Sequence, residues 1–258
     1  MNPGDDLRGL LAGLGLLGKR LGVETDTVGL TARNWDMVRA AMLADDLDAA
    51  LAETRAGAFE GDILAAMQGA VFKGGGDYAG NEFILGSGPG ALLCRYHSGR
   101  RHLDAQDQMT LEWAGAWRRY HAATMRTLVI GKANDTQKRM HAAAVEALEA
   151  CEAAIRPGAP MGDVFDALAR VFDAHGLSHA RLNACGYGMG AIFGPIWVDF
   201  PMFYRGNPLL MQAGNVYFLH MILMDSDAGL AMCWGQSVLV TETGVERLSR
   251  HPLDLVEC

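Results

Sequence analysis

The sequence predicts an α+β fold in which two similar halves share one antiparallel sheet. Two helical segments are followed by strands, and the same order of helices and strands then repeats. This order favours strands packed into one curved sheet with the helices outside. The chain has 258 residues, and 50% of them are hydrophobic, which is enough apolar material for one large core.

The first half is expected to contain two helices and two short strands. Apolar residues recur at helical spacing over residues 45–54, and a second helix over 61–72 should end at the sequence KGGG. The segments 82–86 and 91–96 read as strands because the turn sequence SGPG separates them.

Two longer strands complete the first half, and the second half then repeats the order of two helices followed by strands. Segments 108–114 and 120–130 alternate well enough to predict the antiparallel pair that ends the first half. An alanine-rich helix over 141–156 should stop at a Pro-Gly pair, and another helix is expected over 163–175. Two apolar, β-branched segments predict the last strands, at 217–224 and 236–241.

Charge and cysteine content narrow the classes of partner. The net charge is −8 and no run of Lys or Arg stands out, so we expect neither nucleic acid nor an anionic membrane as a partner. The five cysteines occur singly and no secretory or membrane-spanning segment is present, which indicates reduced thiols and a cytoplasmic location.

Several short phrases carry a family resemblance. LEWAG at 111–115 and YHAATMRT at 120–127 resemble the first metal-ligand hairpin of the pita-bread enzymes, peptidase family M24, which include metallo-aminopeptidases, prolidases and creatinase. GNP at 206–208 and VTETG at 240–244 resemble other phrases of that family. The resemblance runs from about residue 45 to the end. It implies the pita-bread fold, with two pseudo-symmetric α/β halves around a curved antiparallel sheet.

The resemblance also implies that a metal site has been emptied. Metal-dependent members carry Asp, Asp, His, Glu and Glu at the five ligand positions, which read here as Glu112, Ala123, Tyr187, His220 and Gly235. Alanine and glycine side chains cannot ligate, and one Glu with one His is too few for a dinuclear site with bridging carboxylates. We therefore expect no metal and no other cofactor.

Longer phrases resemble the ectoine hydrolases, a metal-free group within the family. These phrases are GNEFILGSG at 80–88, CRYHSGRR at 94–101, LNACGY at 182–187 and FLHMILMDSD at 218–227. The resemblance implies a hydrolase that opens the cyclic amidine of ectoine to N-acetyl-2,4-diaminobutyrate. Creatinase also lacks metal, but it keeps an acidic residue where His220 stands, which disfavours creatinase itself.

Three residues are candidates for the chemistry. Glu112 lies in an apolar run, where a carboxylate is costly without a partner, and it is expected to act as nucleophile or base. The alternative is an internal salt bridge. His97 and His220 are the proton-transfer candidates, because only His titrates near neutral pH without perturbation. For His220, a satisfied core histidine is the competing interpretation.

Four more residues are candidates for substrate binding. Tyr187 lies between two glycines and is expected to hydrogen-bond the substrate, or else to be a packed aromatic. Arg126 or Arg95 is expected to hold the substrate carboxylate through a bidentate fork, although Arg126 is equally suited to a structural ion pair. Trp113, with other aromatic residues, is expected to contact the cationic ring through cation–π interactions. The alternative is that Trp113 belongs to the core.

The resemblance implies a domain division and a small-molecule partner. Residues 1–43 are expected to be a remnant of a creatinase-like amino-terminal domain with its linker, and residues 44–258 the catalytic domain. The expected substrate is an ectoine-like zwitterion, and the expected assembly is a homodimer. Two alternatives remain at this stage: another creatinase-like C–N hydrolase, or a non-catalytic pita-bread module that binds peptide or protein.

Overall fold

The computed structural model describes residues 12–14, 46–93 and 100–258. One sheet of nine strands forms the centre of the molecule, with the order β1-β2-β3-β7-β6-β4-β5, while β8 pairs with β7 and β9 with β3. All pairings are antiparallel except that of β3 with β9. The strands are β1 (Ile84–Ser87), β2 (Asp107–Trp117), β3 (Tyr120–Ile130), β4 (Ala184–Gly188), β5 (Asp199–Tyr204), β6 (Val216–Asp225), β7 (Leu230–Val240), β8 (Val245–Arg247) and β9 (Val256–Glu257).

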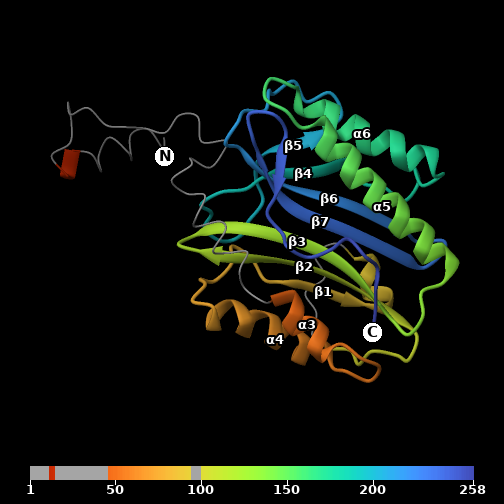
Figure 1. Ribbon diagram of the computed structural model, residues 1–258. Helices are drawn as coiled ribbons and strands as arrows, with labels where there is room; N and C mark the ends of the chain where they lie inside the picture. The colour runs from red at the N-terminus through yellow and green to blue at the C-terminus, as the bar shows by residue number, and fades with distance from the viewer. Residues whose placement is uncertain (1–11, 15–45, 94–99) are drawn as a thin grey trace.

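Two pairs of helices cover the two halves of this sheet (Figure 1). One pair lies along β1 to β3 and the other along β6, β7 and β4. The helices are α3 (Asp46–Glu53), α4 (Glu60–Lys73), α5 (Asp135–Ala154) and α6 (Met161–Ala174). Each pair has its own buried apolar cluster against the sheet, so the predicted arrangement of two α/β halves on one antiparallel sheet is confirmed.

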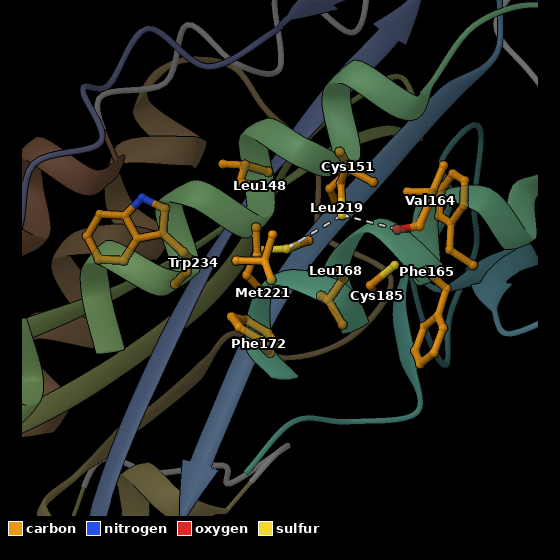
Figure 2. Close-up of a cluster of buried hydrophobic side chains, with 14 of the residues drawn as sticks. Leu148, Cys151, Val164, Phe165, Leu168, Phe172, Cys185, Leu219, Met221 and Trp234 are labelled. Carbon is orange, nitrogen blue, oxygen red and sulfur yellow. Dashed lines mark hydrogen bonds between the residues drawn. The ribbon is translucent and has the colours of Figure 1, made fainter. Parts of the chain in front are cut away.

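The cluster under α5 and α6 encloses two of the cysteines (Figure 2). The Cys151 thiol donates to the Val164 carbonyl oxygen at 3.4 Å and lies 3.9 Å from the Met221 sulfur. Cys185 is fully buried beside Cys151, and burial raises the pKa of its thiol well above the usual range. A protonated, buried thiol is a poor nucleophile, so Cys185 reads as a core residue.

Several elements differ from the sequence-based expectation. The segment 91–96 is not a strand where the structure describes it, because residues Gly88–Leu92 form a 3₁₀ turn, η1, with Pro89 in its first turn. Helix α5 begins six residues earlier than expected, because the Asn134 side chain accepts from the Gln137 N–H at 2.9 Å and Gln137 caps Asn134 in return. Strands β4 and β5 were not predicted.

The predicted division at residue 43 lies outside the described residues. Among the helices that the structure describes, none combines the length and the apolar character needed to cross a membrane.

Candidate active site

A row of four residues crosses the centre of the sheet and carries the candidate site. The strand registers place Glu112 on β2 opposite Met125 on β3, Met125 opposite Gly235 on β7, and Gly235 opposite His220 on β6. Residues directly opposite each other share a face of the sheet, so the side chains of Glu112, Met125 and His220 point to the same face, with Gly235 between the last two. Three strand spacings, about 14 Å along the sheet, separate the backbones of Glu112 and His220.

Tyr187 on β4 links the two ends of this row. It pairs with Phe218, which lies two residues before His220 and therefore on the same face. The Tyr187 hydroxyl donates to Glu112 Oε1 at 3.3 Å, and its ring centroid lies 5.7 Å from that of His220. All three side chains are buried, with 8% of Glu112, 3% of Tyr187 and 7% of His220 exposed. The curvature of the sheet thus brings together residues from β2, β4 and β6.

The space beside Glu112 is small and apolar. Its described lining residues besides Glu112 and Thr110 are all apolar or sulfur-containing: Ile84, Leu93, Leu111, Met125, Ile222, Met224 and Cys233. The cavity has a volume of about 10 Å³, which holds about one water molecule. Glu112 is the one residue with a carboxyl group among the described residues that line the cavity.

The match to a known family decides the identity of the fold. Residues 36–242 match metallopeptidase family M24. The chain belongs to family M24. The structure of an X-Pro aminopeptidase from Thermotoga maritima superimposes with a TM-score of 0.85 at 17% identity, covering 98% of this chain and 72% of that one. A prolidase from Pyrococcus furiosus gives 0.81 at 18% identity, covering 87% and 66%. These similarities confirm the predicted pita-bread fold.

Curated relatives of this M24 chain include proteins with and without a described activity. An uncharacterized hydrolase/peptidase of Sinorhizobium fredii is 28% identical over 84% of this chain and 55% of its own length. An ectoine hydrolase of Halomonas elongata is 28% identical over 73% of this chain and 46% of its own length. The chain therefore spans about half the length of these relatives.

The residues at the family's ligand positions do not fit a dinuclear metal centre. These five positions hold one carboxylate, Glu112, while Ala123 and Gly235 offer no ligand atom. A Cβ atom at Gly235 would lie 2.7 Å from the Leu219 carbonyl oxygen and 2.8 Å from the Phe218 ring, so even a small side chain there requires its neighbours to move. Among the described residues, no three His, Cys, Asp or Glu side chains form a group that could hold a metal ion.

Two predicted binding residues lie on the other face of the sheet. Trp113 follows Glu112 directly in β2, and Arg126 pairs with Leu111, so both side chains point away from the Glu112 cavity. Arg126 donates to the carbonyl oxygens of Met125 and Gly235 and stacks over Trp234, with burial lowering its pKa to about 10. The predicted contact of Arg126 and Trp113 with a substrate held at Glu112 therefore does not fit this structure.

The remaining predicted residues are Arg95 and His97, which lie outside the described residues. The structure adds one residue that the sequence suggested only as a possible aromatic wall. The Trp197 indole N–H donates to the Tyr187 hydroxyl at 2.9 Å, and Trp197 is 1% exposed. A buried Trp needs a partner for its N–H, but a contact across a loop of ten residues leaves no periodic pattern that could reveal it.

His121 does not belong to the row of site residues, but it contacts the segment that holds Trp197. Its Nε2 accepts from the Gly80 backbone N–H at 2.8 Å, so the ring is neutral and its Nδ1–H donates to the Arg119 carbonyl oxygen, also at 2.8 Å. Burial, as the largest cause, lowers the pKa of His121 below its ordinary value. A proton on Nε2 would break the contact with Gly80, the neighbour of Asn81, which in turn holds Trp197.

This arrangement predicts a loss of stability in mild acid. When a His pKa is lower in the folded protein than in the unfolded chain, the unfolded chain binds the proton first as the pH falls. The free energy of unfolding is therefore largest above about pH 6.5. Below that pH it decreases, by at most about 1.4 kcal/mol per pH unit for one group. Urea unfolding at pH 7.5 and 5.5 measures this difference. His121→Gln keeps an acceptor near Gly80 and cannot titrate, so the difference in free energy of unfolding between the two pH values should be smaller in this variant. The assignment would be contradicted if the loss of stability between pH 7.5 and 5.5 were as large in His121→Gln as in the unchanged protein, with His102→Gln, at an exposed position, as the control.

Proposed function

We propose that this chain is a metal-independent hydrolase that opens the cyclic amidine of ectoine to N-acetyl-2,4-diaminobutyrate. The observation that carries the proposal is the buried carboxylate of Glu112, which shares one face of the sheet with Tyr187 and His220 and lies in an apolar cavity. The similarity to the ectoine hydrolase of Halomonas elongata supports the choice of substrate.

The charge of the cavity suits an amidine. Ectoine carries an amidinium and a carboxylate, and the amidinium is a compact cation. A carboxylate in surroundings of low polarity attracts such a cation more strongly than it would in water, whereas a divalent metal would repel it. The one charged side chain among the described lining residues has the sign that this substrate needs.

Two routes for the bond changes are open to Glu112. As a nucleophile, its oxygen bonds to the amidine carbon, one ring C–N bond breaks, and the departing nitrogen takes a proton, which leaves an O-acyl imidate that keeps the other nitrogen; water then cleaves this imidate, releases the amide and restores the carboxylate. As a base, Glu112 takes a proton from water while the water oxygen bonds to that carbon, and the same proton passes to the departing nitrogen. Both routes consume one water and yield one amide and one amine.

Tyr187 and His220 have separate roles in this proposal. The Tyr187 hydroxyl already donates to Glu112 at 3.3 Å, a long contact that can tighten when a substrate brings charge to the site. The His220 ring centroid lies 5.7 Å from that of Tyr187, and His220 is proposed as the group that moves the proton to the departing nitrogen. Arg95 and His97 stay predictions, as do the homodimer and the cytoplasmic location.

One observation favours a second candidate, a binding module without turnover. The cavity of about 10 Å³ beside Glu112 is far smaller than the 300–1,000 Å³ that ligand pockets typically offer. A ring of the size of ectoine can enter only if side chains such as Leu93 and Met224 move. A module that never admits a substrate needs no such movement.

The first test is incubation of the purified protein with ectoine, followed by NMR of the ring protons. We expect ring opening that is unchanged by EDTA and by added Zn²⁺, Mn²⁺ or Co²⁺. A panel of hydroxyectoine, creatine and Xaa-Pro dipeptides separates the amidine substrate from other C–N hydrolysis. Turnover of dipeptides that requires added metal would overturn the proposal, and a folded protein with no turnover of any panel member would favour the binding module.

A further inference from the structure

The side chain of Trp197 forms the outer end of a buried hydrogen-bonded chain that leads to Glu112. Its indole N–H donates to the Tyr187 hydroxyl at 2.9 Å, and that hydroxyl donates to Glu112 Oε1 at 3.3 Å. Trp197 lies between β4 and β5 with 1% of its surface exposed. Both contacts are buried, and the order of donors along the chain follows from which groups can donate and which can accept.

That order determines where the Tyr187 hydrogen points. An indole N–H can only donate, so the Tyr187 oxygen must accept from Trp197. A phenol has one hydrogen, and because an ionised carboxylate can only accept, this hydrogen is directed to Glu112. Without the indole, the hydroxyl can rotate and accept from another donor. We infer that Trp197 is a positioning residue that holds the Tyr187 hydroxyl as a donor toward Glu112. Its effect on catalysis rests on the proposed function of Glu112.

The backbone around Trp197 is anchored so that the indole keeps this position. The Trp197 N–H donates to Asn81 Oδ1 at 3.0 Å, and the adjacent Gly80 N–H is held by His121. A Cβ at Gly80 would lie 3.1 Å from the carbonyl carbon and oxygen of Ile196 and from the Trp197 nitrogen, so glycine permits this close approach. The segment before β1 therefore fixes the loop that carries Trp197, and that loop fixes Tyr187.

The first test needs no enzymatic activity. The chain has five Trp residues, so a ¹⁵N-labelled sample gives one indole N–H signal per Trp, and Trp197→Phe identifies the signal of Trp197. Because donors and acceptors in a chain polarise one another, Tyr187→Phe should move this signal strongly and Glu112→Gln should move it by a smaller amount. A Trp197 signal that stays in place in Tyr187→Phe would show that the contact is absent in solution and overturn the inference.

The second test is a double-mutant cycle on ectoine turnover. Trp197→Phe should lower kcat about tenfold with little change in KM, but less than twofold when Tyr187 is already Phe, because the indole acts only through that hydroxyl. Equal losses in both backgrounds would overturn the inference. If the protein turns over no substrate, the proposed function fails while the NMR test still decides the role of Trp197.

Trp234→Phe is the matched control for both tests. Trp234 is also fully buried, but it lies on the other face of the sheet, and its indole N–H finds no hydrogen-bond partner in the part of the chain that the structure describes. The substitution removes the same atoms from the core without touching Tyr187. It should leave the Trp197 signal in place and kcat within about twofold. A loss in Trp234→Phe equal to that in Trp197→Phe would assign the effect to packing and overturn the positioning role.

Discussion

Replacing Glu112 by Gln should reduce ectoine ring opening by about 10³-fold or more while the protein stays folded. The amide is nearly the same size as the carboxylate, but it can neither attack the amidine carbon nor take a proton from water. It also removes the negative charge that attracts the amidinium, so substrate binding should weaken as well. Steady-state kinetics by NMR or by amine detection, with circular dichroism as the test of folding, measures both effects.

The control for this substitution is Glu242→Gln, which removes a carboxylate from an exposed position. It should keep the rate within about twofold of the unchanged protein. Persistent turnover in Glu112→Gln would show that another group performs the chemistry. The binding module would instead be supported if the unchanged protein showed no turnover and if Glu112→Gln and Glu242→Gln bound ectoine equally tightly.

The position of the candidate site was accessible from the sequence because strands have a period of two. The strand over 120–130 was predicted with the bounds that β3 has. Its register with β2 then fixes which residues share a face. The same rule could have excluded Trp113, since it is adjacent to Glu112 in one strand. The alternation of polar and apolar residues over 108–113 also places Glu112 and Trp113 on opposite faces, although both faces of β2 are buried.

The contacts that complete the site were not accessible in this way. Strand β4 contains the sequence ACGYG, and glycine has a low strand propensity, so its neighbours give little signal of a strand. The bond between Tyr187 and Trp197 depends on how the loop after β4 returns to the sheet. The start of α5 was readable, however, because Asn134 and Gln137 have the spacing of a capping box.

The second large effect is expected at Glu60, the first residue of α4. This carboxylate is fully buried and accepts four hydrogen bonds from residues that the structure describes. Its Oε1 accepts from the Ser87 N–H at 2.9 Å and the Ser87 hydroxyl at 2.5 Å, while its Oε2 accepts from the N–H groups of Arg100 at 3.2 Å and Arg101 at 3.1 Å. One side chain thus ties the start of α4 to the end of β1 and to the segment before β2.

Glu60→Gln should lower the free energy of unfolding by about 3 kcal/mol, because an amide has one acceptor oxygen and its NH₂ would face two N–H donors. Ser87→Ala removes one donor and leaves the carboxylate three others, so it should cost about 1 kcal/mol. Urea unfolding at pH 7 measures both, with Glu242→Gln as the exposed control. A Glu60→Gln protein within 0.5 kcal/mol of the unchanged protein would contradict the assigned network.

The same substitution reports on the candidate site through β1. Ile84 of β1 pairs with Glu112 of β2 and lines the cavity beside it, and β1 ends at Ser87, which Glu60 holds. A loosened end of β1 should therefore weaken the packing around Glu112 as well as the fold. In conditions where Glu60→Gln is still folded, ectoine turnover should fall by a few fold, far less than in Glu112→Gln, because the reacting carboxylate itself is intact.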